Sequence, residues 1–460
     1  MNELGKSKIA PISQSDVIWN IAASFFKVAG GFLLLPFILR YFPEEMVGIW
    51  TIFLTINTLV ALLDFGFYPT FSRNVSYVLS GAKSLYKIGY DEVDKSNIEI
   101  DYSLLKGLIS AMKWFYCRIS LFVLILLLTI GTFYIHYILG NYHGNKTDIY
   151  IAWIVACLFN TCNFYTTFYD PLLLGSGLIK RSKQITIIGR SAYIIVAIIL
   201  IINHFGIISI IAAQFISMII IRILSHFSFF TIEIKSKLAQ VTAFSKRNII
   251  KAIAPNAVKV GLVYCSGIAV SQFTVFIAPI FLDLTTVASY GISIQLVTIL
   301  VTISKLYIDT YTPKIVEYRT QNRIEEMRNI FIKGELYFCF IAVVGGISIV
   351  LLGDWALNLV KSQTQLLATL PLIGITIFSL LDGHQIIATN ILLASNKVPF
   401  LKSSLITGIV SILMIIIFLY IFKLGIWALI LGPGIVQILY QDWKWPLSVY
   451  QQMFSNNNNS

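Results

Sequence analysis

Six ionisable residues stand out inside apolar stretches of the sequence, where an ionised side chain is costly. These residues are Lys27, Arg222, Lys259, Asp64, Asp382 and His384. Even lenient scales put the cost of a charge at the centre of a bilayer at about 2.5–3.5 kcal/mol. Such side chains are expected to face water, a charged partner or a bound ion, so these six are the candidate functional residues.

Three of the six are cations. Lys27 lies roughly 15 Å into the apolar run 17–39, which is long enough to cross a ~30 Å hydrocarbon core. Arg222 is deep within another run, and Lys259 lies about a turn and a half inside a third. One interpretation is a cationic cavity that binds an anion, whereas the alternative for Lys27 is a static pair with Asp64.

The acids and the histidine leave two interpretations open. Asp382, Gln385 and Thr389 share one face at helical spacing, with His384 beside them. This face fits a proton or sugar contact, and it fits interhelical hydrogen bonding equally well. Asp64 is either the partner of an intramembrane cation or a coupling-ion site. Because Asp64 and Asp382 are the acids that stand out, we expect the membrane interior to be net positive.

Motifs that would indicate an enzyme are absent from the sequence. It contains no G-x-x-x-x-G-K-[ST] phosphate loop, no H-E-x-x-H and no G-x-S-x-G, and its five histidines lack metal-ligand spacing. We therefore expect no catalytic residues, no metal and no cofactor.

Composition predicts a polytopic membrane protein of the all-α class. Of 460 residues, 57% are hydrophobic and 12% are charged, against about 25% charged in soluble domains. The mean hydropathy is +0.80. We expect twelve transmembrane helices, at approximately 17–39, 46–68, 114–138, 149–170, 185–202, 207–230, 253–277, 285–310, 331–352, 366–394, 403–422 and 426–445.

Lysine and arginine predict the orientation of these spans. With the N-terminus inside, the cytoplasmic segments hold 25 of these residues and the outer loops hold four. This bias places both termini in the cytoplasm. The net charge of +12 is therefore topogenic and does not indicate nucleic-acid binding. Asn203–Gly206 and Lys423–Gly425 are expected to be tight turns between antiparallel helices.

A weak internal repeat divides the chain into two halves. Val47-Gly48-Ile49-Trp50 resembles Val287-Ala288-Ser289-Tyr290, and Leu172–Ser176 resembles Ile391–Ser395. We expect six helices in residues 1–230, a cytoplasmic linker at 231–252, six helices in 253–445 and a tail at 446–460. Repeated halves are typical of transporters with a central cavity and alternating access.

Several short motifs resemble a known family. Ile18-Trp19-Asn20, Leu33–Phe37, Val47–Trp50 and Leu63–Phe67 followed by Ser72-Arg73 are similar to segments of polysaccharide flippases of the Wzx type. In the second half, Val287–Gly291 and Pro313 look like the corresponding helix and loop. These flippases belong to the multidrug/oligosaccharidyl-lipid/polysaccharide exporter superfamily, and the resemblance is loose but covers most of the chain.

The resemblance implies a flippase in the bacterial cytoplasmic (inner) membrane. Its cargo would be an undecaprenyl-diphosphate-linked oligosaccharide for O-antigen, capsule or a similar glycan, and other glycan-assembly proteins could be partners. Lys27, Arg222 and Lys259 would offset the cost of moving the anionic diphosphate. The alternatives are a multidrug/cation antiporter of the same superfamily, which would use Asp64 and Asp382, and a membrane glycan polymerase.

Overall fold

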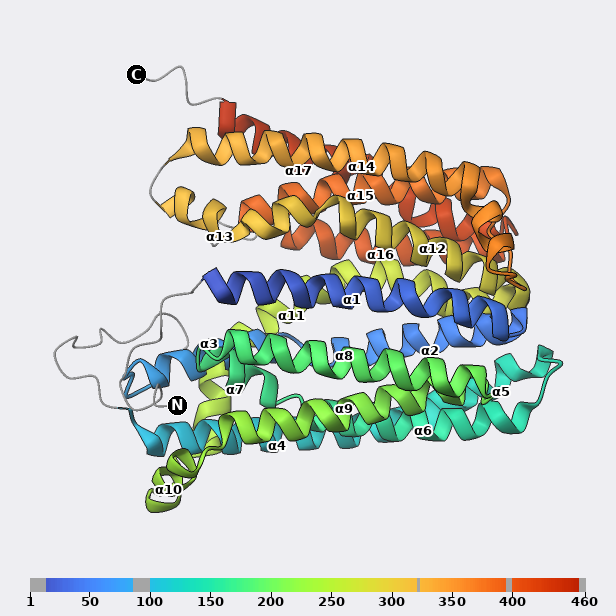
Figure 1. The fold of residues 1–460 in the computed structure, drawn as a ribbon. Helices are drawn as coiled ribbons and strands as arrows, with labels where there is room; N and C mark the ends of the chain where they lie inside the picture. Colours follow the sequence, from blue (N-terminus) through green and yellow to red (C-terminus); the bar gives the residue numbers. More distant parts are fainter. Residues whose placement is uncertain (1–13, 86–99, 321–322, 394–398, 455–460) are drawn as a thin grey trace. The chain divides into compact units, whose positions relative to one another are not determined.

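Helices account for all the regular structure in the part of the chain that the structure describes. The computed structural model describes residues 14–85, 100–320, 323–393 and 399–454, and contains no strand within those ranges (Figure 1). The expected all-α class is therefore confirmed. No regular backbone other than a helix could hydrogen-bond its own polar groups within one segment in lipid.

Nine of the described helices are long and apolar enough to cross a membrane. Each of the twelve expected spans overlaps a helix. Three of these spans fall on helices outside the set of nine, namely α1 (Gln14–Tyr41), α11 (Lys246–Phe281) and α17 (Ile426–Phe454). The side chains of several residues in α1 and α11 lie outside the described part. The protein is thus a multi-pass membrane protein.

The chain separates into two compact units. Unit 1 comprises Met1–Phe37 and Asn57–Cys265, and unit 2 comprises Ile38–Ile56 and Ser266–Ser460. The helix α2 (Glu44–Leu62) is divided between them, as are α1 and α11. The predicted domain boundaries at residues 230 and 253 stay predictions, but the grouping of Ile38–Ile56 with unit 2 was not expected.

Unit 1 is built mainly on antiparallel pairs, with α8 against α9 and α4 against α6. Two short helices, α3 and α7, pack together beside them. The helices that lie wholly in unit 1 are α3 (Phe67–Leu79), α4 (Tyr102–Leu126), the π-helical turn η1 (Leu127–Gly131), α5 (Thr132–Ile138), the 3-10 turn η2 (Leu139–Asn141), α6 (Lys146–Thr166), α7 (Tyr169–Gly175), α8 (Ile179–Ile202), α9 (Ile208–Phe229) and α10 (Ile232–Gln240).

Unit 2 is centred on α15 and α17, which pack along each other, with α14 against both. Figure 1 shows these helices in orange and red. The helices that lie wholly in unit 2 are α12 (Leu284–Ser304), α13 (Leu306–Thr320), α14 (Ile324–Leu359), α15 (Thr369–Leu393), α16 (Leu401–Tyr420) and α17. The last of these continues to Phe454, past the expected start of the tail at residue 446.

The second expected span ends earlier than residue 68. Helix α2 stops at Leu62, and a turn over residues 63–66 leads into α3. Phe65 and Gly66 both have positive φ, 49° and 73°, which an α-helix does not tolerate. The sequence Asp64-Phe65-Gly66 carries this signal, because glycine adopts the left-handed region at little cost.

The first pair of repeated motifs, Val47–Trp50 and Val287–Tyr290, lies side by side within unit 2. A Cβ at Gly48 of α2 would lie 2.5 Å from the backbone oxygen of Leu284 and 3.5 Å from the nitrogen of Ala288. A Cβ at Gly291 of α12 would likewise meet Thr51 of α2 at 2.5 Å. Glycine at these positions therefore allows the backbones of α2 and α12 to approach closely, as in other small-residue contacts between membrane helices.

The two expected tight turns are confirmed. Helices α8 and α9 are joined over residues 203–207, where His204 and Gly206 have φ of 60° and 57°. Helices α16 and α17 are joined over residues 421–425, where Lys423 and Gly425 have φ of 51° and 57°. Left-handed residues of this kind close a helix C-terminus by satisfying its last carbonyl groups.

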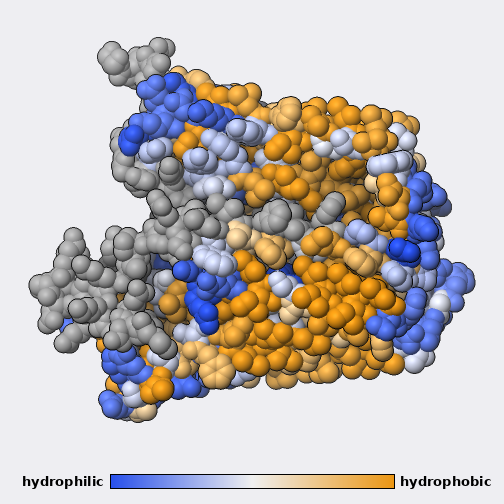
Figure 2. Space-filling model, viewed as in Figure 1, coloured by the Kyte–Doolittle hydropathy of each residue, from blue (hydrophilic) through white to orange (hydrophobic). Residues whose placement is uncertain are grey.

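The exposed faces of α8 and α9 are apolar away from the helix ends. Figure 2 shows hydrophobic side chains over these helices and hydrophilic ones near helix ends. Ile195 and Ile199 of α8 are 58% and 54% exposed, and Phe227 of α9 is 70% exposed. A face of this size would be unfavourable in water, so we assign it to lipid.

Candidate functional site

Arg222 of α9 makes an ion pair that joins two helices of unit 1. Its Nη1 donates to Oδ1 of Asp170 at 2.8 Å, and its Nη2 donates to Oδ1 of Asn163 at 3.2 Å. The side chains of Arg222 and Asp170 are 13% and 33% exposed. The guanidinium Nε is buried and has no partner among the described residues. One donor of Arg222 is therefore unused in this arrangement.

The position of Asp170 follows from a break in the chain after α6. This helix ends at Thr166, and the short α7 begins at Tyr169, so Asp170 and Pro171 occupy its first turn. Proline is tolerated there because the first helical N–H groups have no intrahelical acceptor. A carboxylate is favoured there by the helix dipole. The break thus holds an acid beside α9 at the level of Arg222.

Asp64 is another acid of unit 1 whose carboxylate has hydrogen-bond donors. Its Oδ2 accepts the backbone N–H of Tyr68 at 2.9 Å, and its Oδ1 accepts the hydroxyl of Tyr116 at 2.8 Å. Tyr68 is close enough to Asp64, Asp170 and Arg222 to interact with each electrostatically. Asp64 therefore ties the turn after α2 to α4, at the edge of the polar cluster around Arg222.

The other two expected cations also belong to unit 1. Lys27 lies on α1 and Lys259 on α11, but their side chains lie outside the described part of the structure. The Lys27–Asp64 pair and the cationic cavity both remain predictions. The three candidate cations nevertheless share one unit, because residues 27, 222 and 259 all fall within it.

The candidate residues of α15 lie in a different cluster, inside unit 2. Nδ1 of His384 lies 2.7 Å from Oε2 of Glu335 on α14. Asp382 interacts with Gln437 of α17 and is close enough to Asp442 of the same helix for their charges to interact. His384 interacts electrostatically with Asp442 as well. The structure thus groups Asp382 and His384 with two acids from other helices.

Sequence reasoning missed three acids that the structure places at these clusters: Asp170, Glu335 and Asp442. All three fall within the expected spans, so the interior is less positive than the sequence count suggested. One local signal existed, because Gln437, Gln441 and Asp442 place three polar side chains close together in an otherwise apolar span. Glu335 and His384 are 49 positions apart, and nothing in the sequence joins them.

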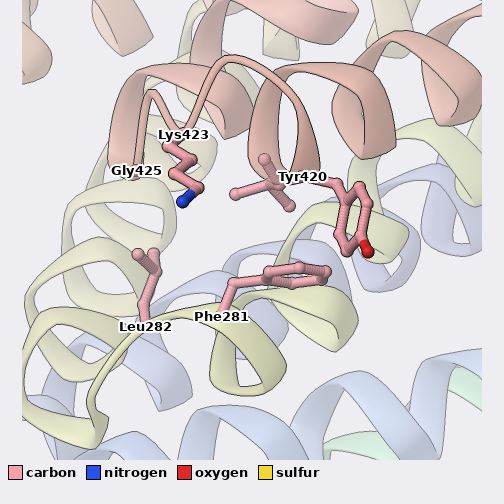
Figure 3. Close-up of a pocket in the computed structure, with 6 residues that line it drawn as sticks. Phe281, Leu282, Tyr420, Lys423 and Gly425 are labelled. Atoms are coloured by element: carbon pink, nitrogen blue, oxygen red, sulfur yellow. The ribbon is translucent and has the colours of Figure 1, made fainter.

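A cavity of about 580 Å³ lies elsewhere in unit 2, at the turn between α16 and α17. Figure 3 shows Lys423 pointing into it, above Phe281 and Leu282 and beside Tyr420. None of the six candidate residues lines this cavity. Among the described residues, no three His, Cys, Asp or Glu side chains are arranged to hold a metal ion.

No family model and no curated protein sequence matches this chain. Solved structures do. An inward-facing MATE family multidrug resistance transporter of the MOP superfamily matches with a TM-score of 0.63 and 12% identity, covering 98% of this chain and 97% of that one. An outward-facing MATE transporter matches with a TM-score of 0.57 and 12% identity, over 96% and 95%.

The chain has the fold of the MOP-superfamily transporters. A further match is a MOP superfamily transporter from Pyrococcus furiosus whose binding pocket is described as having reverse polarity, suggesting a different function. Its TM-score is 0.54 with 11% identity over 95% of both chains. At these identities the likeness concerns the fold, so function must be argued from this chain's own residues.

Proposed function

We propose that this protein is a flippase for anionic lipid-linked oligosaccharides, with undecaprenyl-diphosphate-linked repeat units as its cargo. The observation that carries the proposal is that Lys27, Arg222 and Lys259 all belong to unit 1. A diphosphate that crosses the bilayer core needs positive charge along its path, because an unpaired anion in hydrocarbon is strongly disfavoured. The protein would work in the bacterial inner membrane, with both termini cytoplasmic, for O-antigen, capsule or a related glycan.

Arg222 is the best-defined contact for the diphosphate. Its guanidinium group can bind two phosphate oxygens at once, and its buried Nε is free. Asp170 accepts from Nη1 of the same guanidinium group. A diphosphate would compete with this carboxylate for Arg222, so the ion pair would open during transport. Lys27 and Lys259 act in the proposal as point charges along the same unit.

Complementation of a flippase-null bacterial strain tests the proposal, with surface glycan scored beside membrane abundance of the protein. Arg222→Ala and Lys27→Ala should each reduce glycan assembly strongly, whereas Lys27→Arg should retain much of it because charge matters more than shape. Arg190→Ala is the matched control, since Arg190 is a half-buried cation on α8 of the same unit. Full glycan assembly in the Lys27→Ala, Arg222→Ala double variant would refute the cationic site.

A second experiment separates cargo binding from a structural role of the ion pair. Arg222→Ala alone leaves Asp170 without its partner, which should lower protein abundance. Adding Asp170→Asn removes the stranded charge and should restore abundance. If Arg222 contacts the diphosphate, glycan assembly stays low in the double variant. If the pair only holds the fold together, glycan assembly returns with abundance.

A multidrug/cation antiporter is the second candidate function. The acids of unit 2 favour it, and so do the structural neighbours described as multidrug transporters. Expression in a strain that lacks its own drug exporters distinguishes the two. A flippase leaves resistance to cationic drugs unchanged, whereas an antiporter raises it and loses this effect in the Asp382→Asn variant.

A further inference from the structure

Unit 2 holds four buried or half-buried titratable groups at the contact of α14, α15 and α17. We call Glu335, His384 and Asp442 the unit 2 triad, with Asp382 as its neighbour. The three helices pack against one another in pairs, and Figure 1 shows them together in orange and red. All four groups belong to the same unit.

The Glu335–His384 contact requires a proton between its two atoms. The carboxylate Oε2 and the imidazole Nδ1 are 2.7 Å apart, and both are acceptors unless one carries hydrogen. The Glu335 side chain is only 9% exposed, and its second oxygen, Oε1, is buried without a partner. Oε2 of Glu335 thus shares a proton with His384, whereas Oε1 has no hydrogen-bond partner among the described residues.

Asp442 adds a second carboxyl group that lacks described hydrogen-bond donors. Both its oxygens are buried and have no hydrogen-bond partner among the described residues. Oδ1 of Asp382 is in the same condition. Asp442 interacts electrostatically with Asp382 and His384. Four carboxyl oxygens at one helix contact therefore lack donors, which is costly for any of them that is ionised.

The charges of the cluster do not cancel. Three carboxylates face one imidazole, so the cluster carries a net charge of at least −2 when all acids are ionised. The other titratable groups near Glu335 are Cys339 and Tyr450, which bring no positive charge. Lys305, on the turn from α12 to α13, interacts with Asp309. A small cation must therefore enter, and a proton is the one that binds an orphaned carboxyl oxygen without further ligands.

We propose that the unit 2 triad is a proton-exchange site, in which a proton binds Asp442 or Glu335 and is relayed through His384. Each proton bound forms one O–H or N–H bond and lowers the negative charge of the cluster by one. The absence of any metal-holding group of three among the described residues favours a proton over a metal ion. That this exchange drives cargo movement rests on the proposed function, whereas proton binding itself does not.

Infrared spectroscopy of the full-length protein in lipid tests proton binding directly. Protonated carboxyl groups absorb apart from carboxylates, so their signal can be followed through an acid-to-alkaline titration. The wild type should retain a carboxyl signal above the pH at which exposed acids lose theirs. Glu335→Gln and Asp442→Asn should each remove part of it, and His384→Asn should shift its midpoint. Asp354→Asn, an exposed acid on α14, is the matched control and should change nothing in that range.

The titration is repeated with sodium replaced by choline. Equal curves in both salts support a proton site, whereas loss of the carboxyl signal on adding sodium would overturn it in favour of a sodium site. Difference spectra with no change between the wild type and the three triad variants would show that the triad stays in one protonation state. That result would also overturn the proposal.

Proteoliposomes test the coupling separately, with undecaprenyl diphosphate carrying one fluorescent sugar as the probe. An imposed pH gradient should change the rate of probe movement in the wild type and in Asp354→Asn, and this response should vanish in Glu335→Gln and Asp442→Asn. A rate of probe movement in the wild type that does not change with the pH gradient would refute the coupling. No movement at all, with an intact infrared titration, would refute the flippase function and leave the proton site standing.

Discussion

Unit 1 and unit 2 both contain acids within the expected spans, but these acids differ in how many of their oxygens have a hydrogen-bond or ion-pair partner. In unit 1, Asp170 is paired with Arg222 and Asp64 accepts two hydrogen bonds. In unit 2, Asp442 has no donor at either oxygen, and Asp382 and Glu335 each leave one oxygen without a partner. The three candidate cations fall in unit 1, and three acids with orphaned oxygens fall in unit 2.

This difference fits the proposal that the two units have different roles in transport. A satisfied pair stabilises the fold and can be opened by a stronger competitor, as the diphosphate would do at Arg222. Orphaned acids destabilise the fold until a cation arrives, so they are suited to exchange. The predictions below test this contrast by its effects on stability and activity.

The largest effect is expected at the segment of α2 that belongs to unit 2. Gly48→Ala places a methyl group against the backbone oxygen of Leu284, which has no side-chain freedom with which to move away. We expect a loss of about 3 kcal/mol of stability, at the upper end for overpacking. Thermal unfolding in detergent, followed by tryptophan fluorescence, measures it.

The control for this prediction is Gly31→Ala on α1, where a Cβ would meet nothing within 4 Å. That variant should be neutral or slightly more stable, since alanine favours helices by up to about 1 kcal/mol over glycine. Equal unfolding midpoints for the two variants would show that α2 and α12 are less closely packed than described.

The next largest effect concerns the paired acid. Asp170→Asn leaves the guanidinium of Arg222 without its counter-charge and should lower the unfolding midpoint. Breaking a fully buried pair costs about 3–5 kcal/mol, and the cost here should be smaller because Asp170 is 33% exposed. The same unfolding assay gives the value, and Asp148→Asn in the first turn of α6 is the control.

The opposite sign is expected for the orphaned acid. Asp442→Asn removes a charge that has no donor at either oxygen, and it supplies an amide that can donate. We expect stability to rise by about 1 kcal/mol at neutral pH. The gain should disappear in acid, where the wild-type carboxyl group is protonated. If Asp442→Asn is less stable than the wild type at neutral pH, the inference that the unpaired acids of unit 2 destabilise the fold is wrong.

The smallest effect is expected at Asp64. Tyr116→Phe removes one of its two hydrogen bonds and leaves the backbone N–H of Tyr68 in place. We expect a loss of about 1 kcal/mol with little change in surface glycan. A strong loss of glycan at normal abundance would instead assign Asp64 to transport, as one of the sequence-based interpretations holds.

The sequence predicts the helices well because their signals are local. Apolar runs of spanning length, the Lys and Arg bias, and turn residues such as Gly206 and Gly425 each lie within a few positions of what they specify. The end of α2 was misplaced although its signal, Asp64-Phe65-Gly66, was also local. There the continued apolar sequence after Gly66 outweighed the glycine.

The candidate site could be predicted only in part because its partners are distant in sequence. Arg222 and Asp170 are 52 positions apart, and His384 and Glu335 are 49 apart. Hydropathy shows that each residue is inside a span but not which face it occupies or which helix it meets. The oxygens of Asp442 are unpaired because no described donor side chain packs against them. That absence follows from the packing of the helices and cannot be read from the sequence.

The assignment of Ile38–Ile56 to unit 2 has a consequence for how genes of this kind can recombine. A chimaera that joined residues 1–252 of one parent to the remainder from another would pair α12 with a foreign α2. At Gly48 and Gly291 that contact tolerates no additional atom without movement of a backbone or side chain. In viable exchanges, the short segment around Gly48 and the second half should therefore come from the same parent. The residues that must be exchanged together are then discontinuous along the gene.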